Sequence, residues 1–182
     1  MAHLFQYGSN CDATRLNAPE RLGGAATNPR LAHTIGEFDI AFNVWSNGNG
    51  CAASNLTPTP GRHAWGVLYD IPNDRATGKG RPGPKTMEEI EGPRYQATTI
   101  TVQTTDGQEH HATTFLVKKN AEAEGLWTSK DYVEHIVTGL RQHNAPPEYV
   151  EHVINTAIQN NDQAKRRADE ETRGISTLHL PM

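Results

Sequence analysis

Alternating apolar and polar residues predict a series of short strands over the first part of the chain. In Phe38–Phe42, every second residue is large and apolar, as in a strand with one buried face. Asp106-Gly107 is a strong hairpin signal between two β-branched runs. The segments that we expect to form strands are 3–7, 31–35, 38–42, 51–57, 64–71, 95–104 and 108–117.

The apolar spacing becomes helical after Ser129. Tyr132, Ile136 and Leu140 recur at the interval of one helix face, and Ser129 is a suitable N-cap. We expect this helix to end near His143-Asn144, and a second helix to cover 148–163. A shorter helix, 87–91, lies between the strands and stops at Gly92-Pro93. Strands followed by helices predict an α+β domain, a small mixed β-barrel with flanking helices, rather than a doubly wound parallel sheet.

Some segments show neither the alternation of a strand nor the apolar spacing of a helix. Residues 17–30 are expected to be loop, and 73–85, rich in Gly, Pro and Lys, to be a mobile insertion. Beyond Asp162 the residues are mostly charged, so the last helix is expected to fray into a loose extension. We therefore divide the chain into a domain, 1–160, and a polar C-terminal tail, 161–182. Ile175, Leu178 and Leu180 could dock on the body or on a second copy, which leaves a homodimer open.

Composition narrows the classes of partner. The 182 residues suffice for one domain, and only 35% of them are hydrophobic. A net charge of −4 with scattered Lys and Arg gives no reason to expect nucleic acid. No apolar run approaches the roughly 20 residues that span a bilayer, and the N-terminus does not have the pattern of a secretory signal. Two cysteines, Cys11 and Cys51, are too few for a disulfide framework, so we expect a cytoplasmic protein.

The junction Tyr7-Gly8-Ser9-Asn10 allows two interpretations. It could be a tight turn with a small polar cap. Alternatively, successive backbone N–H groups in such a turn could hold one negative oxygen, either a carboxylate or a developing oxyanion. Glu91 also allows two interpretations. It could be part of a solvated acidic helix end, or a functional acid that Gly92-Pro93 fixes close to the sheet.

Both features occur in one known family. The chain resembles the γ-glutamyl cyclotransferase-like (AIG2-like) family over roughly residues 3 to 155. The matching elements are Tyr7-Gly8-Ser9-Asn10 after the first strand, the strand Trp65–Tyr69, Glu91-Gly92 followed by Tyr95, the hairpin at Asp106-Gly107, and the late segment Tyr132-(x6)-Gly139-Leu140-(x8)-Tyr149. One departure is 73–85, which is longer and richer in Gly and Pro than the family's compact helix.

The resemblance implies a compact barrel and an intramolecular aminolysis of a γ-glutamyl amine, amino acid or peptide. The substrate's α-amino group attacks its own γ-carbonyl and releases an amine and 5-oxoproline. Glu91 would be the general acid and base. The backbone of Gly8, Ser9 and Asn10 would hold the carboxylate and the oxyanion, and Tyr7, Tyr95 and Tyr132 would form walls and donate hydrogen bonds. The reaction requires no metal and no organic cofactor.

Two alternatives remain open: a different amide or acyl transfer in the same pocket, or a non-catalytic binding or immunity-type module.

Other motifs are weaker indications of function. Prolines spoil the dinucleotide-like string Gly78–Gly83, and the adjacent His110-His111 would point to opposite faces of a strand and so could not easily share a metal. Cys11 is expected to be packed rather than reactive. Trp45 is either a core aromatic or a pocket wall.

Overall fold

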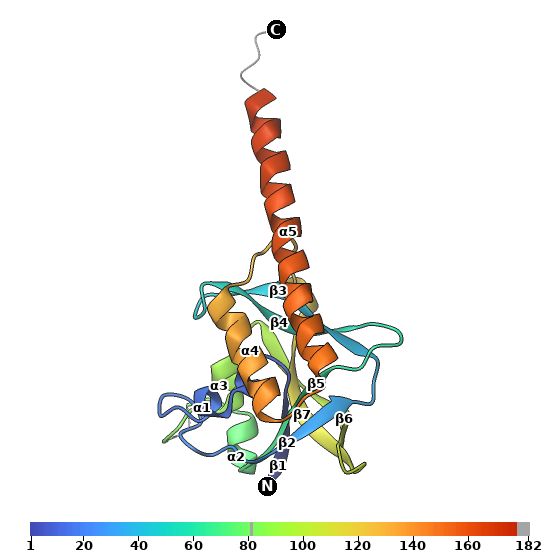
Figure 1. The fold of residues 1–182 in the computed structure, drawn as a ribbon. Coiled ribbons are helices and arrows are strands. Elements are labelled where there is room, and N and C mark those ends of the chain that lie inside the picture. The colour runs from blue at the N-terminus through green and yellow to red at the C-terminus, as the bar shows by residue number, and fades with distance from the viewer. Residues whose placement is uncertain (81, 178–182) are drawn as a thin grey trace.

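A barrel of strands forms the base of the protein, and a long C-terminal helix projects from it (Figure 1). The computed structural model describes residues 1–80 and 82–177. The strands are β1 (Ala2–Gln6), β2 (Thr27–Thr34), β3 (Phe38–Ser46), β4 (Cys51–Pro58), β5 (Trp65–Ile71), β6 (Tyr95–Thr104) and β7 (Glu109–Val117). The helices are α1 (Ala13–Leu16), α2 (Asn73–Ala76), α3 (Met87–Glu91), α4 (Lys130–Gln142) and α5 (Pro147–Thr177), with 3-10 turns η1 (Ser9–Cys11) and η2 (Lys119–Ala121).

Five strands close into a barrel in the order β1-β5-β2-β6-β7, and β3 and β4 form a separate two-stranded sheet. Most neighbours are antiparallel, but β1 meets β7 in parallel, where Leu4 pairs with Thr113. The barrel is therefore mixed. This confirms the predicted α+β class with a small mixed barrel and flanking helices.

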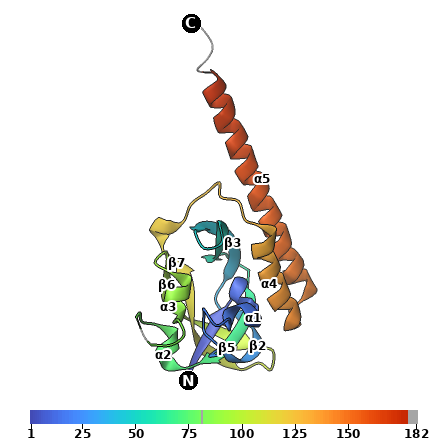
Figure 2. The ribbon, with the colours of Figure 1, turned by 90° about the vertical axis from the view of Figure 1, so that its left-hand side faces the viewer.

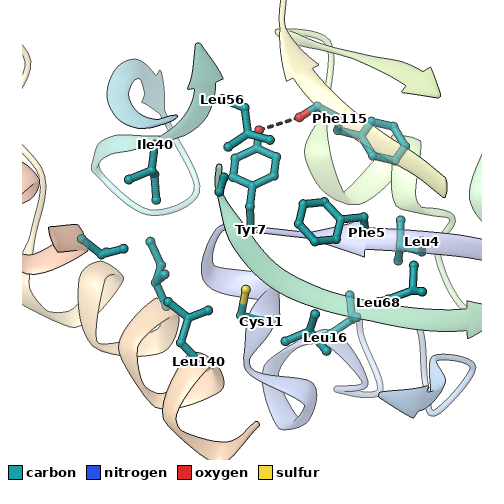
Figure 3. Packing of buried hydrophobic residues seen from close by; sticks show 14 of the residues in the cluster. Leu4, Phe5, Tyr7, Cys11, Leu16, Ile40, Leu56, Leu68, Phe115 and Leu140 are labelled. Carbon is teal, nitrogen blue, oxygen red and sulfur yellow. Dashed lines mark hydrogen bonds between the residues drawn. The ribbon is translucent and has the colours of Figure 1, made fainter. Parts of the chain in front are cut away.

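The core fills the barrel and the space beneath α4. Leu4, Phe5 and Tyr69 are fully buried, and α4 turns its apolar face inward, as its spacing predicted. Figure 3 shows Leu140 of α4 pointing toward Cys11 of the turn that follows β1. No helix in the described part of the chain combines the length and the apolar character needed to cross a membrane.

Two segments expected to be irregular contain regular structure. Strand β2 begins at Thr27, inside the predicted loop 17–30, because its first residues pair with β5 across an irregular register. The predicted insertion 73–85 begins with helix α2. Arg75 donates hydrogen bonds to the carbonyl oxygens of Pro84 (2.5 Å) and Pro82 (3.1 Å), and these bonds close the segment on itself. The β2–β5 pairing joins residues distant in sequence, and the Arg75 bonds depend on the folded path of the segment, so local composition revealed neither.

Helix α5 is longer than predicted: it continues to Thr177, whereas the sequence predicted an end near residue 163. Its C-terminal half projects away from the barrel in both views (Figures 1 and 2). Ala, Lys, Arg, Gln and Glu are frequent there, and these residues favour helix without tertiary contacts. Leu178, Leu180 and the side chain of Ile175 lie outside the described residues, and the domain boundary at 160 stays a prediction.

Helix α4 lies directly against the turn that follows β1. A Cβ atom on Gly139 would meet the carbonyl carbon of Cys11 at 2.1 Å and its oxygen at 2.3 Å. These are backbone atoms, so a rotamer change could not relieve the overlap. Glycine is therefore required at position 139 for space, and the close approach fixes the position of the turn.

We predict that Gly139→Ala destabilises the protein by about 1–3 kcal/mol or more, because overpacking would force α4 and the turn apart. The direction of this stability change is informative, because Gly→Ala at an exposed helix position stabilises a protein by roughly 1 kcal/mol. Thermal unfolding measures the change. The control is Glu134→Ala, exposed on the same helix, for which we expect a change within about 0.5 kcal/mol. An unchanged or higher Tm for Gly139→Ala would contradict the proposed packing.

Candidate active site

The turn that follows β1 is held from several directions. Its own hydrogen bonds run from the N–H of Cys11 to the oxygen of Gly8 (2.9 Å) and from the N–H of Asp12 to the oxygen of Ser9 (3.4 Å). The hydroxyl of Tyr69, on β5, donates to the carbonyl oxygens of Asn10 (3.2 Å) and Cys11 (3.0 Å). The turn's own bonds thus use neither the N–H of Ser9 nor that of Asn10.

Asp12 connects this turn to two helices. One carboxylate oxygen accepts the N–H groups of Thr14 (3.0 Å) and Arg15 (3.2 Å) and so caps α1. The other lies 2.9 Å from Nδ1 of His135 on α4. The turn is therefore braced by β5, α1 and α4, and its backbone is rigidly presented.

Glycine is needed at position 8 for space and not for a special turn conformation. Its φ of −100° is open to other residues, so no left-handed conformation demands glycine. Instead, a Cβ atom there would lie 2.3 Å from Oγ of Ser54 on β4. The absence of a side chain lets β4 approach the turn and close one side of a pocket.

That pocket has a volume of about 260 Å³. Every residue predicted for the site lines it: Tyr7, Gly8, Ser9, Asn10, Glu91, Tyr95 and Tyr132. Three further residues, Gln6, Ser54 and Phe115, were not predicted. No local pattern singles out Ser54, and only the fold of the β3–β4 hairpin over the turn brings it there. Gln6 and Phe115 could have been suspected from their strands, which lie beside the turn.

The three tyrosines differ in what their hydroxyls do. Tyr7 donates to the carbonyl oxygen of Phe115 (2.6 Å) and Tyr95 to that of Ser54 (2.8 Å), so both protons are committed to the backbone. Tyr132 instead accepts the N–H of Ser54 (3.0 Å), and its oxygen also lies 3.0 Å from Oγ of Ser54. Tyr7 and Tyr95 are therefore walls, and Tyr132 has a proton that a ligand could compete for.

Helix α3 places Glu91 at the mouth of the pocket. Thr86 and Glu89 form a capping box at its start, and Gly92, with φ +81°, ends it. Burial raises the pKa of Glu91 from its usual value to about 7. The nearby charge of Arg21 and a hydrogen bond from Asn10 oppose this rise, and burial outweighs them.

Asn10 joins Arg21 to Glu91. Its Oδ1 accepts a hydrogen bond from Arg21, and its Nδ2 donates to Oε1 of Glu91 at 2.9 Å. A guanidinium has only donors, so Arg21 orients the amide with its NH₂ toward the carboxylate. Within the described residues, Oε2 of Glu91 has no hydrogen-bond partner, and a ligand could use it. Arg21 was not predicted, because it comes from the loop after α1.

Other candidates lie outside this pocket. Trp45 lines a neighbouring groove rather than the pocket itself. Cys11 and Cys51 are both buried and free, and burial raises the pKa of the Cys11 thiol, so it is poorly nucleophilic. His111 bonds to Thr101 on the barrel surface. Across residues 1–80 and 82–177, no cluster of His, Cys, Asp and Glu is arranged to hold a metal ion.

The chemistry available in the pocket is proton transfer next to anion binding. One partly neutral carboxyl lines the same small, tyrosine-walled pocket as the backbone of Ser9 and Asn10, whose N–H groups the turn's own bonds leave unused. A group with a pKa near 7 can both accept and donate a proton at neutral pH. The combination suits a reaction that develops negative charge on a carbonyl oxygen while a proton moves between two nitrogens.

Solved structures share this architecture. A γ-glutamyl cyclotransferase superposes with a TM-score of 0.68 at 19% identity, over 84% of this chain and 85% of that one. An uncharacterised human protein gives 0.70 at 21% identity, over the same shares of the two chains. A yeast γ-glutamyl cyclotransferase specific to glutathione gives 0.53 at 11% identity, over 88% of this chain and 99% of that one. At such identities the likeness establishes the fold.

No curated protein matches the sequence. The family model of the AIG2-like family, however, matches residues 63–153, which is half of the chain. The match includes Glu91, Tyr95 and Tyr132, and it agrees with the structural neighbours. On the sequence match and the shared barrel together, this chain belongs to the AIG2-like, γ-glutamyl cyclotransferase-like family.

Proposed function

We propose that this protein is a γ-glutamyl cyclotransferase. Its substrate would be a small γ-glutamyl amine, amino acid or peptide, and its products a free amine and 5-oxoproline. The observation that carries the proposal is the carboxyl group of Glu91, which has a pKa of about 7 and lies at the pocket formed by the turn after β1. The cytoplasm is the compartment that we propose for it.

The reaction forms one bond and breaks one. The substrate's α-nitrogen bonds to its γ-carbonyl carbon, and the bond from that carbon to the leaving nitrogen breaks. The α-nitrogen loses two protons, because it is an ammonium in the substrate and a lactam N–H in 5-oxoproline, and the leaving nitrogen gains two and departs as an ammonium. Glu91 would carry protons from one nitrogen to the other, first as base and then as acid, through Oε2, which has no hydrogen-bond partner among the described residues.

The turn would stabilise the charges of the substrate. The N–H groups of Ser9 and Asn10, which the turn's own bonds leave unused, are candidates for the oxyanion or the α-carboxylate. Because β5, α1 and α4 brace the turn, these dipoles would need little reorganisation. Tyr7 and Tyr95, whose hydroxyls are committed to the backbone, would shape the space in which the glutamyl chain folds onto itself.

No protein nucleophile takes part, because both reacting groups belong to the substrate. The hydroxyl of Ser9 therefore needs no activating base. The reaction also calls for neither a metal nor an organic cofactor. A purely binding module would have no need of a proton-transfer group in this position, so the test of Glu91 separates it from an enzyme.

The proposed role of Glu91 predicts that Glu91→Gln lowers 5-oxoproline release by at least about 100-fold, the usual minimum contribution of a general acid or base. The assay offers γ-glutamyl amino acids and amines and measures 5-oxoproline by mass spectrometry. The matched control is Glu109→Gln, exposed on β7, which should keep full activity. Normal turnover by Glu91→Gln would refute the mechanism.

Misfolding cannot mimic this loss, because the variant should be the more stable protein. The folded pKa of Glu91, about 7, exceeds its usual 4.5. Its ionised form therefore costs stability, progressively from pH 4.5 to 7 and fully above pH 7. Glu91→Gln should raise stability at pH 8 by up to about 3 kcal/mol, and by little at pH 4.5.

A second prediction follows from the same pKa. Attack requires ionised Glu91, so kcat/KM should rise about tenfold per pH unit at low pH and level off above a midpoint near 7. A midpoint near 4.5, the usual value for Glu, would contradict the assigned role of burial.

Asn10→Ala tests the hydrogen bond from Asn10 to Glu91, which favours the ionised form of the Glu91 carboxylate. Its loss, worth about 1 kcal/mol, should raise the midpoint of the pH–rate profile by about 0.7 unit. A change confined to loop structure would lower the rate without moving the midpoint. A profile with a lower rate and an unmoved midpoint would therefore reduce Asn10 to a structural role.

A further inference from the structure

A second, wider space adjoins the pocket. This outer groove has a volume of about 980 Å³ and shares Glu91 and Tyr95 with the pocket. The pocket, at about 260 Å³, is much the smaller of the two. Ser9 and Asn10, whose N–H groups are the proposed anion donors, line the pocket and not the outer groove. A substrate whose reacting bond lies at Glu91 would therefore place its glutamyl part in the pocket and its leaving amine in the outer groove.

The outer groove is strongly basic. Arg15, Arg21 and Arg94 line it, and Glu91 is the only acidic residue among its lining residues. The ion pairs found within residues 1–80 and 82–177 include none of these arginines. Glu91, which interacts electrostatically with Arg15 and Arg21, is the one carboxylate among these lining residues, so three arginines against one acid leave the groove with a net positive charge.

Their hydrogen bonds go to neutral oxygens instead. Arg15 donates to Oδ1 of Asn49 (2.8 Å) and Arg94 to the carbonyl oxygen of Trp45 (3.0 Å). Each of these bonds holds one N–H of a guanidinium group, and the hydrogen bonds found among the described residues leave further N–H donors on both groups. The arginines are positioned before any ligand arrives, which lowers the entropic cost of binding one.

Two of these arginines also have unmet hydrogen-bonding capacity. The Nε atoms of Arg15 and Arg21 are buried and have no hydrogen-bond partner among the described residues. Burial lowers the pKa of Arg21 and the charge of nearby Arg15 lowers it further, and these two effects outweigh the opposing charges of Glu91 and Glu20. Two cations held close together, each with an unused buried donor, are the arrangement that an anion would relieve.

We propose that the outer groove is a leaving-group subsite for an amine that carries a carboxylate, such as an amino acid or a short peptide. The proposal rests on the cyclotransferase function proposed above. The arginines would bind the carboxylate of the leaving amine, and a cationic leaving group, such as a polyamine, would be repelled. The subsite thus selects among the γ-glutamyl compounds that the pocket alone would accept.

The test compares three substrates that share the γ-glutamyl group: γ-L-glutamyl-L-alanine, γ-L-glutamyl-L-alaninamide and mono-γ-L-glutamyl-1,4-diaminobutane. The first two differ only by replacement of a carboxylate with a neutral amide. Measured as kcat/KM for 5-oxoproline release, the acid should exceed the amide by about 10- to 100-fold, the usual range for one charged hydrogen-bonded contact. The diamine compound should be the poorest.

Variants then locate the preference in the groove. Arg15→Gln and Arg94→Gln should each reduce the acid-to-amide ratio of kcat/KM several-fold. Because the readout is a ratio within one variant, partial loss of active protein does not affect it. Arg166→Gln is the matched control, since Arg166 is exposed on α5 and bonds to the backbone of its own helix. Its ratio should equal that of the wild type.

The outcomes separate the two proposals. If none of the three compounds yields 5-oxoproline, the cyclotransferase function is wrong and the subsite falls with it. If all three react at similar kcat/KM, or the neutral or cationic compound is preferred, only the subsite is wrong. A preference for the acid that persists unchanged in both Arg15→Gln and Arg94→Gln would likewise overturn its assignment to these arginines.

Discussion

The close packing of α4 on the turn after β1 is the contact on which the site depends. Because Gly139 has no side chain, the helix backbone approaches the backbone of Cys11 directly. Asp12 and Tyr69 then hold the turn from the other sides. A turn of this length has little intrinsic stability, so its dipoles can be kept in a fixed direction only by such tertiary contacts.

Glu91 depends on a second balance, between burial and charge. Burial alone would favour a neutral carboxyl at physiological pH, and a fully exposed glutamate would be ionised throughout. The charge of Arg21 and the hydrogen bond from the amide of Asn10 lower this pKa again, and the result is a pKa of about 7. The same arginine lines the outer groove, so one cation contributes both to the proton chemistry and to the electrostatics of the neighbouring space.

The sequence predicted much of the fold, because local signals determine it. Asp106-Gly107 marked the β6–β7 hairpin, Ser129 capped α4, and the apolar spacing of α4 identified its buried face. Predictions that relied on composition alone were less accurate. The first residues of β2 were missed because pairing with the distant β5 forms them, and helix α2 was missed because the Gly and Pro residues of its segment suggested only loop. Helix α5 was cut short because its polar residues suggested disorder, although they favour helix.

By itself, the sequence determined the family, most of the strand and helix order, and seven of the ten residues that line the pocket. The elements follow from periodicities along the chain, whereas the family and the site residues follow from short motifs that resemble those of a known family. Only the tertiary structure decided that Ser54 closes the pocket, that Arg21 orients Asn10 against Glu91, and that three arginines meet beside it. Each of these arrangements includes residues from segments tens of positions apart, and no local pattern encodes it, because only the folding of the barrel brings the segments together.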